Sequence, residues 1–193
     1  MSRITMALTG ALLGAFVLVG GFMSDAFATG KCPAQSTVSA ITSTDPEFKA
    51  AGPLALATIR SAKALAKEGG NRLTVFLSNG VFTAAQMDND MVLPIKKRGE
   101  AVVVLKFMNG SNKVAAGDYK PTAGWGKPFF VWADVMVLGS KPAGAVITFV
   151  AGGSGDKGTA TIVEMTDKQV CGTFDITGGL GRVAGSFVAD IVK

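Results

Sequence analysis

The chain has 193 residues, of which 48% are hydrophobic and 17% are charged, and its formal net charge is +5. This balance excludes a disordered charged tail, because such segments combine low hydrophobicity with high charge. The chain has no histidine and two cysteines, which excludes a Ser-His-Asp triad, a histidine-ligated metal and a four-thiolate zinc site.

The N-terminal segment has the organisation of a secretory signal peptide. Arg3 gives a positive start, residues 4–23 are almost wholly apolar, and Ala26-Phe27-Ala28 is a small-x-small cleavage site. We therefore expect residues 1–28 to be a signal peptide and residues 29–193 to form one secreted or periplasmic domain without membrane contact. The alternative is an N-terminal membrane anchor, because the apolar run is long enough to cross a bilayer.

Both cysteines, Cys32 and Cys171, lie in the exported part of the chain. An even number of cysteines in an oxidising compartment favours a disulfide. The bond would tie the mature N-terminus to a late strand. The alternative is two unpaired cysteines that act as small hydrophobic side chains.

The first elements of the domain are short. A strand is expected over 36–42, and residues 44–47 have the capping-box spacing of a helix start. Residues 53–70 are ambiguous, because their alanine, leucine and lysine content favours a helix, whereas the strand-rich surroundings favour a strand over 54–61 that runs into a polar hairpin at 67–71. One helical turn is expected within 83–92.

From Leu73 onward the pattern of inward and outward side chains has a period close to two, which is typical of β-strands. Asn79-Gly80 and Asn109-Gly110 are turn signals between such runs. The predicted strands are residues 73–78, 101–108, 129–138, 145–151, 159–165, 169–176 and 182–192. This pattern predicts a mainly β fold, either an antiparallel β-sandwich or a lipocalin-like barrel of seven to nine strands, with at most one or two short helices.

A small internal repeat marks the last two predicted strands. Val170-Cys-Gly-Thr-Phe174 recurs as Val183-Ala-Gly-Ser-Phe187. In each copy the valine, glycine and phenylalanine share one face of the strand. We expect Phe174 and Phe187 to face each other in the core, with the glycines leaving room for a ring. Cys171 then points to the opposite face, where a segment carrying Cys32 could reach it.

The same region carries a family resemblance. Residues 158–175, followed by Gly185-Ser-Phe187, resemble the C-terminal strands of uncharacterised secreted bacterial β-sandwich or lipocalin-like proteins. Gly117-Asp118-Tyr119 is similar to an earlier G-x-Y element of those proteins. The resemblance implies export and a sandwich or lipocalin-like β fold. It brings no known catalytic residues.

Three motifs look chemical but lack essential partners. Residues 153–158 match G-x-G-x-x-G, yet a strand pattern follows where a dinucleotide site needs a helix, so a hairpin loop is expected. Asp88-Asn89-Asp90 lacks the glycine and distal glutamate of a calcium loop. Lys96-Lys97-Arg98 is an isolated basic run, which is typical of a solvated turn. We expect no metal, no cofactor and no nucleic-acid partner.

Four carboxylates lie near predicted strands, at positions compatible with the wet side: Asp134, Glu164, Asp175 and Asp190. Acid–base catalysis needs two carboxylates that converge with separated pKa values. No spacing brings any two of these residues together, so no catalytic residue is predicted.

Aromatic residues gather between Gly117 and Trp132, where both tryptophans and the only tyrosine lie. Exposed aromatic rings on a β scaffold can stack on sugars or on apolar ligands. We predict a ligand site formed by Tyr119, Trp125 and Trp132 as stacking surfaces, with Lys127 as a hydrogen-bond donor. The alternative is that these rings close the core.

Together these features predict an exported, non-enzymatic β-domain with a binding or structural role in the bacterial envelope or exterior. The ligand classes that fit are a carbohydrate and an apolar small molecule. One alternative is a β-barrel that carries an apolar small molecule in its interior. Another is a secreted hydrolase.

Overall fold

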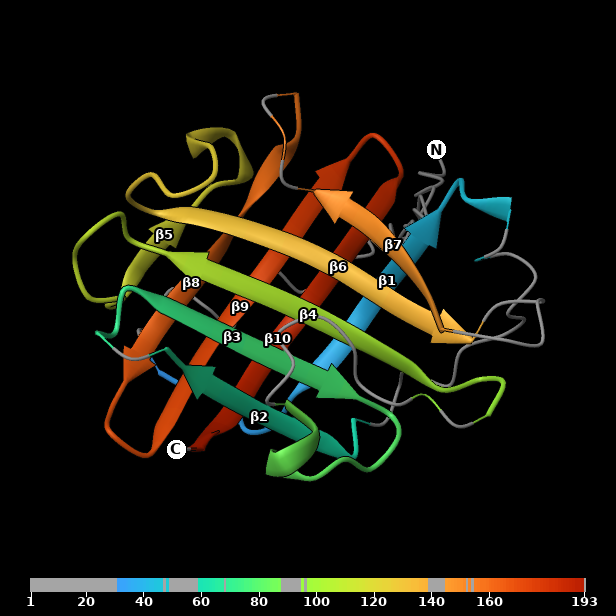
Figure 1. The fold of residues 1–193 in the computed structure, drawn as a ribbon, viewed down its shortest axis with the longest axis horizontal. Coiled ribbons are helices and arrows are strands. Elements are labelled where there is room, and N and C mark those ends of the chain that lie inside the picture. Colours follow the sequence, from blue (N-terminus) through green and yellow to red (C-terminus); the bar gives the residue numbers. More distant parts are fainter. Residues whose placement is uncertain are drawn as a thin grey trace, which may run out of the picture.

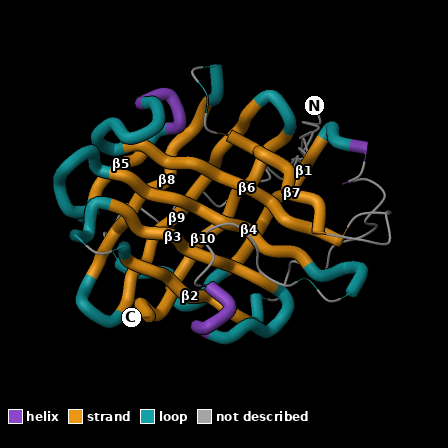
Figure 2. The backbone as a smooth tube through the Cα atoms, in the orientation of Figure 1, coloured by secondary structure: helices purple, strands orange, loops and turns teal. Residues whose placement is uncertain are grey.

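The structure is a computed structural model, which describes residues 31–46, 48, 59–67, 69–87, 95, 97–138, 145–151, 153 and 155–192. Strands dominate the described part, beside two short 3-10 helices and the helical residues Pro46 and Phe48, which match the helix start expected at 44–47 (Figure 2). The elements are β1 (Thr37–Ser43), β2 (Ser61–Ala66), β3 (Arg72–Ser78), η1 (Ala84–Met87), β4 (Ala101–Met108), β5 (Gly117–Tyr119), η2 (Pro121–Ala123), β6 (Phe130–Leu138), β7 (Ala145–Ala151), β8 (Lys157–Met165), β9 (Gln169–Gly178) and β10 (Gly181–Val192).

The described strands belong to one sheet, which confirms the predicted mainly β class. Its strand order is β5-β8-β9-β10-β2-β3-β4-β6-β7, and β1 pairs with β10 off this path. Neighbouring strands are antiparallel except β10 and β2, which run parallel. A bridge between Lys120 and Phe130 links the chain after β5 to β6. The sheet therefore nearly closes on itself, as in a flattened barrel.

The sheet folds over into two layers whose strands cross at a steep angle (Figure 1). One layer contains β2, β3, β4, β6 and β7, and the other contains β8, β9 and β10 with β1. The long strand β10 joins the layers, because its first half pairs with β1 and its last residues pair with β2. Although β7 does not pair with β9 or β10, it lies against both.

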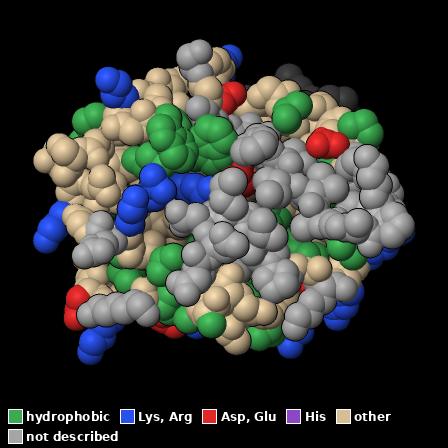
Figure 3. Space-filling view, in the orientation of Figure 1, with side chains coloured by type: hydrophobic (Ala, Val, Ile, Leu, Met, Phe, Trp, Pro, Cys, Tyr) green, Lys and Arg blue, Asp and Glu red, His purple; other side chains and the backbone are tan. Residues whose placement is uncertain are grey.

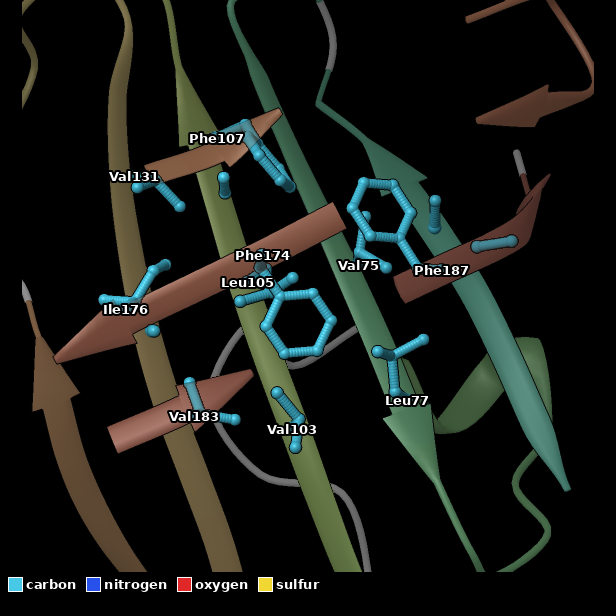
Figure 4. Close-up of a cluster of buried hydrophobic side chains, with 14 of the residues drawn as sticks. Val75, Leu77, Val103, Leu105, Phe107, Val131, Phe174, Ile176, Val183 and Phe187 are labelled. Atoms are coloured by element: carbon cyan, nitrogen blue, oxygen red, sulfur yellow. The ribbon is translucent and has the colours of Figure 1, made fainter. Parts of the chain in front are cut away.

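The core fills the space between the layers. In β4 alternate residues point inward, and Val103, Leu105 and Phe107 all belong to the main buried cluster. Figure 4 shows side chains of β9 and β10 meeting those of β3, β4 and β6. Across the core, the ring centroids of Phe107 and Phe187 lie 5.9 Å apart. The chain's own side chains therefore occupy the described interior.

The internal repeat has the predicted role in this core. The rings of Phe174 and Phe187 lie 6.5 Å apart. Each phenylalanine also lies opposite the glycine of the other copy, since Gly172 pairs with Phe187 and Gly185 pairs with Phe174. A Cβ atom on Gly172 would come within 2.7 Å of the Phe187 ring. The glycines therefore make room for the rings, as predicted.

The predicted disulfide between Cys32 and Cys171 is confirmed, with the two Cα atoms 5.5 Å apart. It joins the segment that precedes β1 to β9. A disulfide is compatible with an oxidising, exported location. The expected signal peptide, residues 1–28, lies outside the described residues. In the part of the chain that the structure describes, no helix has the length and apolarity needed to span a membrane.

Within the ambiguous stretch 53–70, residues 61–66 form strand β2, later than the strand alternative 54–61, and the hairpin follows as expected, whereas residues 53–58 and 68 lie outside the described residues. Strand β2 pairs with β3 on one side and β10 on the other, and these backbone partners override the helical preference of its alanine, leucine and lysine residues. The helical turn expected within 83–92 is η1. Strand β6 begins at Phe130 rather than at Phe129, because Phe129 adopts a left-handed conformation with φ of 53°.

Candidate functional site

Trp125 and Trp132, two of the predicted site residues, lie on the outer face of the sheet formed by β3, β4 and β6. The strand registers align Thr74, Lys106 and Trp132 in one row across the three strands. We call the following set of five residues, which gathers on this face, the outer-face cluster: Arg72, Lys106, Trp125, Trp132 and Asp134. Figure 3 shows hydrophobic side chains over the beginning of β6, with Lys and Arg side chains beside them over β3 and β4.

A buried ion pair lies at the centre of the outer-face cluster. Lys106 and Asp134 are both buried, and the distance from Lys106 Nζ to Asp134 Oδ2 is 3.9 Å. The indole Nε1 of Trp132 donates a 2.7 Å hydrogen bond to Asp134 Oδ1. Burial raises the pKa of Asp134 from 3.8 to about 6, and the Trp132 hydrogen bond and the Lys106 charge oppose this shift. The carboxyl therefore titrates in the mildly acidic range.

Trp125 forms the exposed part of the cluster. It lies between Gly124 and Gly126, whose positive φ angles of 88° and 72° favour glycine and let the chain turn tightly. The backbone N–H of Lys127 donates to the carbonyl of Gly124 and closes this turn. The Trp125 side chain is 55% exposed as a result.

Neighbouring side chains hold the Trp125 ring. Its centroid lies 5.6 Å from that of Trp132 and 6.1 Å from that of Phe130, in both cases edge to face. The guanidinium carbon of Arg72 lies 5.5 Å from the centroid of the Trp125 ring, which is the geometry of a cation–π contact. Trp125 is therefore an accessible ring with a fixed orientation.

Tyr119 does not reach this surface, and its prediction as a stacking residue is corrected. Its side chain is fully buried, and its ring lies 5.1 Å from that of Phe107 in the core. Its hydroxyl donates to the carbonyl of Ala115 and accepts from the N–H of the same residue. Burial also raises the pKa of the Tyr119 hydroxyl above its ordinary value. Tyr119 thus closes one end of the core and anchors the preceding loop.

The structure brings the other predicted residues to one region. Trp125 and Trp132 are in contact, and Lys127 is exposed in the same turn as Trp125. Sequence reasoning did not select Arg72 or Lys106. A signal for Lys106 exists, because it interrupts the apolar run of β4, and a lysine in such a position is rarely buried without a partner.

The remaining strand carboxylates do not converge. Glu164, Asp175 and Asp190 lie opposite Cys171, Ala184 and Gln169 in their registers, so none faces another. Asp175 forms an exposed pair with Arg182, whose hydrogen bond lowers the pKa of the carboxyl. Among the described residues, no three Cys, Asp or Glu side chains gather as a metal site would require.

Comparisons with known proteins identify no family for this chain. The chain matches no protein-family model, and no curated protein or solved structure matches it. The outer-face cluster therefore has to be interpreted from its own chemistry.

Proposed function

We propose that this protein is an exported, non-enzymatic β-domain that binds a carbohydrate at the outer-face cluster. The observation that carries the proposal is the Trp125 ring, which is 55% exposed and in contact with Trp132, Phe130 and Arg72. Sugar rings present an apolar C–H face that packs well on an aromatic ring. Because neighbours already orient Trp125, binding would order few additional side-chain rotamers.

Polar groups beside Trp125 suit the hydroxyl groups of a sugar. Lys127 is exposed in the same turn and can donate hydrogen bonds. Arg72 lies on the Trp125 ring, so its guanidinium is at the same surface. A stacking ring with a small number of polar groups beside it is the usual composition of a specific small-molecule site.

Two features favour surface binding over the alternatives. The rings of Phe107, Phe174, Phe187 and Tyr119 pack in the described interior, which leaves the carrier hypothesis without support there. The four strand carboxylates do not face one another, so the hydrolase hypothesis gains no catalytic pair. The disulfide supports an oxidising location such as the periplasm or the exterior.

Titration of the purified protein with short oligosaccharides tests the proposal. Tetragalacturonate, maltotetraose and chitotetraose are added while tryptophan fluorescence and calorimetric heat are recorded. We expect at least one of them to bind, and Trp125→Ala to weaken that binding at least tenfold, or about 1.4 kcal/mol. The urea unfolding midpoint should change little, because Trp125 is largely exposed.

The matched control is Leu180→Ala, which removes an exposed hydrophobic side chain from the turn between β9 and β10. It should leave binding unchanged. The proposal fails if none of the three oligosaccharides binds or if Trp125→Ala binds as tightly as the wild type. If Trp125→Ala unfolds, Trp125→Phe provides the test, and a folded Trp125→Phe that binds as tightly as the wild type would contradict the role proposed for the indole.

A further inference from the structure

We infer that the carbohydrate is acidic, a polymer of uronate type that runs from Trp125 across a rim of basic side chains. This inference rests on the proposed function and adds the class of ligand. We call the following set of five residues the basic rim: Lys67, Arg72, Lys113, Lys120 and Lys127.

Three loops meet to form the rim. In the β2–β3 hairpin, the carbonyl of Gly70 accepts a hydrogen bond from the N–H of Val114, in the loop between β4 and β5. The side-chain amide of Asn71 donates to the carbonyl of Gly110 in that same loop. A Cβ atom on Gly110 would in turn lie 3.3 Å from Pro128, in the loop that carries Trp125. The cations of all three loops therefore belong to one end of the molecule.

The described residues of these three loops carry only positive charge. The four lysines of the basic rim are exposed, and Arg72 is half-buried. The described residues of the three loops include no Asp or Glu, and Glu68 of the hairpin lies outside the described residues. Two strand carboxylates flank this end: Asp118 accepts a 2.7 Å hydrogen bond from Thr161 Oγ1, and Asp134 pairs with the buried Lys106. Such a surface attracts a ligand that carries several negative charges.

The basic rim adjoins the outer-face cluster. Arg72 belongs to both, because it begins β3 and lies on the Trp125 ring. Arg72 aligns with Phe130 across the neighbouring strands β3, β4 and β6, so their backbones lie about 10 Å apart, and Trp132 is two residues further along β6. A polyuronate carries one carboxylate and one apolar ring face on each sugar. Its chemistry therefore matches a group of cations beside an aromatic ring better than that of a neutral glycan does.

The held orientation of Trp125 favours a polysaccharide over an anionic membrane. An indole that inserts into a bilayer must project from the protein, whereas Trp125 rests edge to face on Trp132 and Phe130 along the sheet. An extended polymer can lie flat on such a surface. A membrane then becomes an outcome that the experiment must distinguish.

Calorimetric titration of the whole purified protein with tetragalacturonate and maltotetraose tests the inference. We expect tetragalacturonate to bind at least tenfold more tightly, and its affinity to fall when NaCl is raised from about 50 to about 300 mM. The double variant Lys113→Gln/Lys120→Gln, which spares the donor Lys127, should lose at least tenfold in affinity for tetragalacturonate and keep its affinity for maltotetraose. The control Lys157→Gln/Lys168→Gln removes two exposed lysines from the other layer and should change neither.

Each other outcome overturns the inference. Equal, salt-independent binding of tetragalacturonate and maltotetraose overturns the inference but leaves the proposed function in place. If neither of these sugars binds and chitotetraose does not bind either, both the inference and the proposed function are wrong. Inorganic polyphosphate that binds as tightly as tetragalacturonate, with no loss in Trp125→Ala, would indicate general polyanion capture. Tight binding to phosphatidylglycerol vesicles without binding to tetragalacturonate would identify a membrane surface instead.

Discussion

Lys106 and Asp134 place two charges in the middle of a largely apolar sheet face. On one side of them lies a second hydrophobic cluster, which includes Phe76, Val104 and Met136. A buried ion pair rarely stabilises a protein more than hydrophobic residues of the same size would. This pair is better explained by its role in positioning the site. Asp134 accepts a hydrogen bond from the indole of Trp132, and Trp125 packs against that indole.

The raised pKa of Asp134 predicts a pH-dependent stability. The folded protein holds this proton more tightly than the unfolded chain does, because the folded pKa is about 6 and the ordinary value is 3.8. The resulting stabilisation is fully present below about pH 4 and is lost as the pH rises through 6. At about 1.4 kcal/mol per pH unit it amounts to at most about 3 kcal/mol. From pH 7 to 4, the free energy of unfolding should therefore rise in the wild type relative to Asp134→Asn.

Urea unfolding at several pH values measures this difference. Asp134→Asn keeps an oxygen that can accept from Trp132 and does not titrate. Asp175→Asn is a control of opposite sign, since the Arg182 hydrogen bond lowers the pKa of Asp175. There the wild type should lose stability relative to the variant as the pH falls below about 4. Parallel pH profiles for the wild type and Asp134→Asn would contradict the role assigned to Asp134.

The site was only partly predictable from the sequence. Composition and local turns pointed to Trp125 and Lys127, since glycines and a proline around them favour an exposed loop. The sequence did not reveal that Tyr119 points into the core, because a three-residue strand has too little pattern to define its inner face. The proximity of Lys106 to Asp134 depends on the register between β4 and β6, which no local signal sets.

At the scale of elements, the β9–β10 hairpin shows how the internal repeat builds the core. Each copy supplies one phenylalanine and the glycine over which the other phenylalanine packs. The two glycines also allow close backbone approach, because a Cβ atom on Gly172 would overlap the carbonyl oxygen of Thr161, and one on Gly185 would overlap that of Thr37. The repeat therefore joins β8, β9, β10 and β1 tightly.

Gly172→Ala should destabilise the protein by about 1–3 kcal/mol, the usual cost of overpacking a core. The added methyl group would meet both the Thr161 backbone and the Phe187 ring, and a well-packed core cannot accommodate it without displacement. Gly179→Ala is the matched control, since a Cβ atom there has no neighbour within 4 Å. Urea unfolding of both variants gives the comparison. If the two substitutions cost the same, the packing explanation is wrong.

The strands were predictable because their side chains alternate, and most predicted runs from Leu73 onward match observed strands closely. Two features of the fold could not be predicted from the sequence, each for a physical reason. Strand β5 has only three residues, so its sequence matches a G-x-Y element but has too short a pattern to predict a strand. The parallel pairing of β10 with β2, which helps to fold the sheet into two crossing layers, joins segments that are far apart in the chain. Local sequence does not encode such a pairing.

At the scale of the whole molecule, two connections hold distant segments together. Strand β10 joins the two layers, and the Cys32–Cys171 disulfide fastens the segment before β1 to β9. The candidate site lies on the outer face of the other layer. The disulfide should therefore support the fold as a whole, while glycan affinity should depend on the site's own side chains as long as the protein is folded.

Loss of the disulfide should lower stability strongly. The bond closes a loop with a sequence separation of 139 residues, and the chain-entropy treatment assigns such a cross-link about 5 kcal/mol as an upper value. The double variant Cys32→Ser/Cys171→Ser should unfold at a much lower urea concentration than the oxidised wild type. Reduced wild type should behave like the variant, and reductant should not affect the variant itself. Equal midpoints for oxidised and reduced protein would mean that hydrogen bonds between β1 and β10 alone hold the N-terminal segment in place.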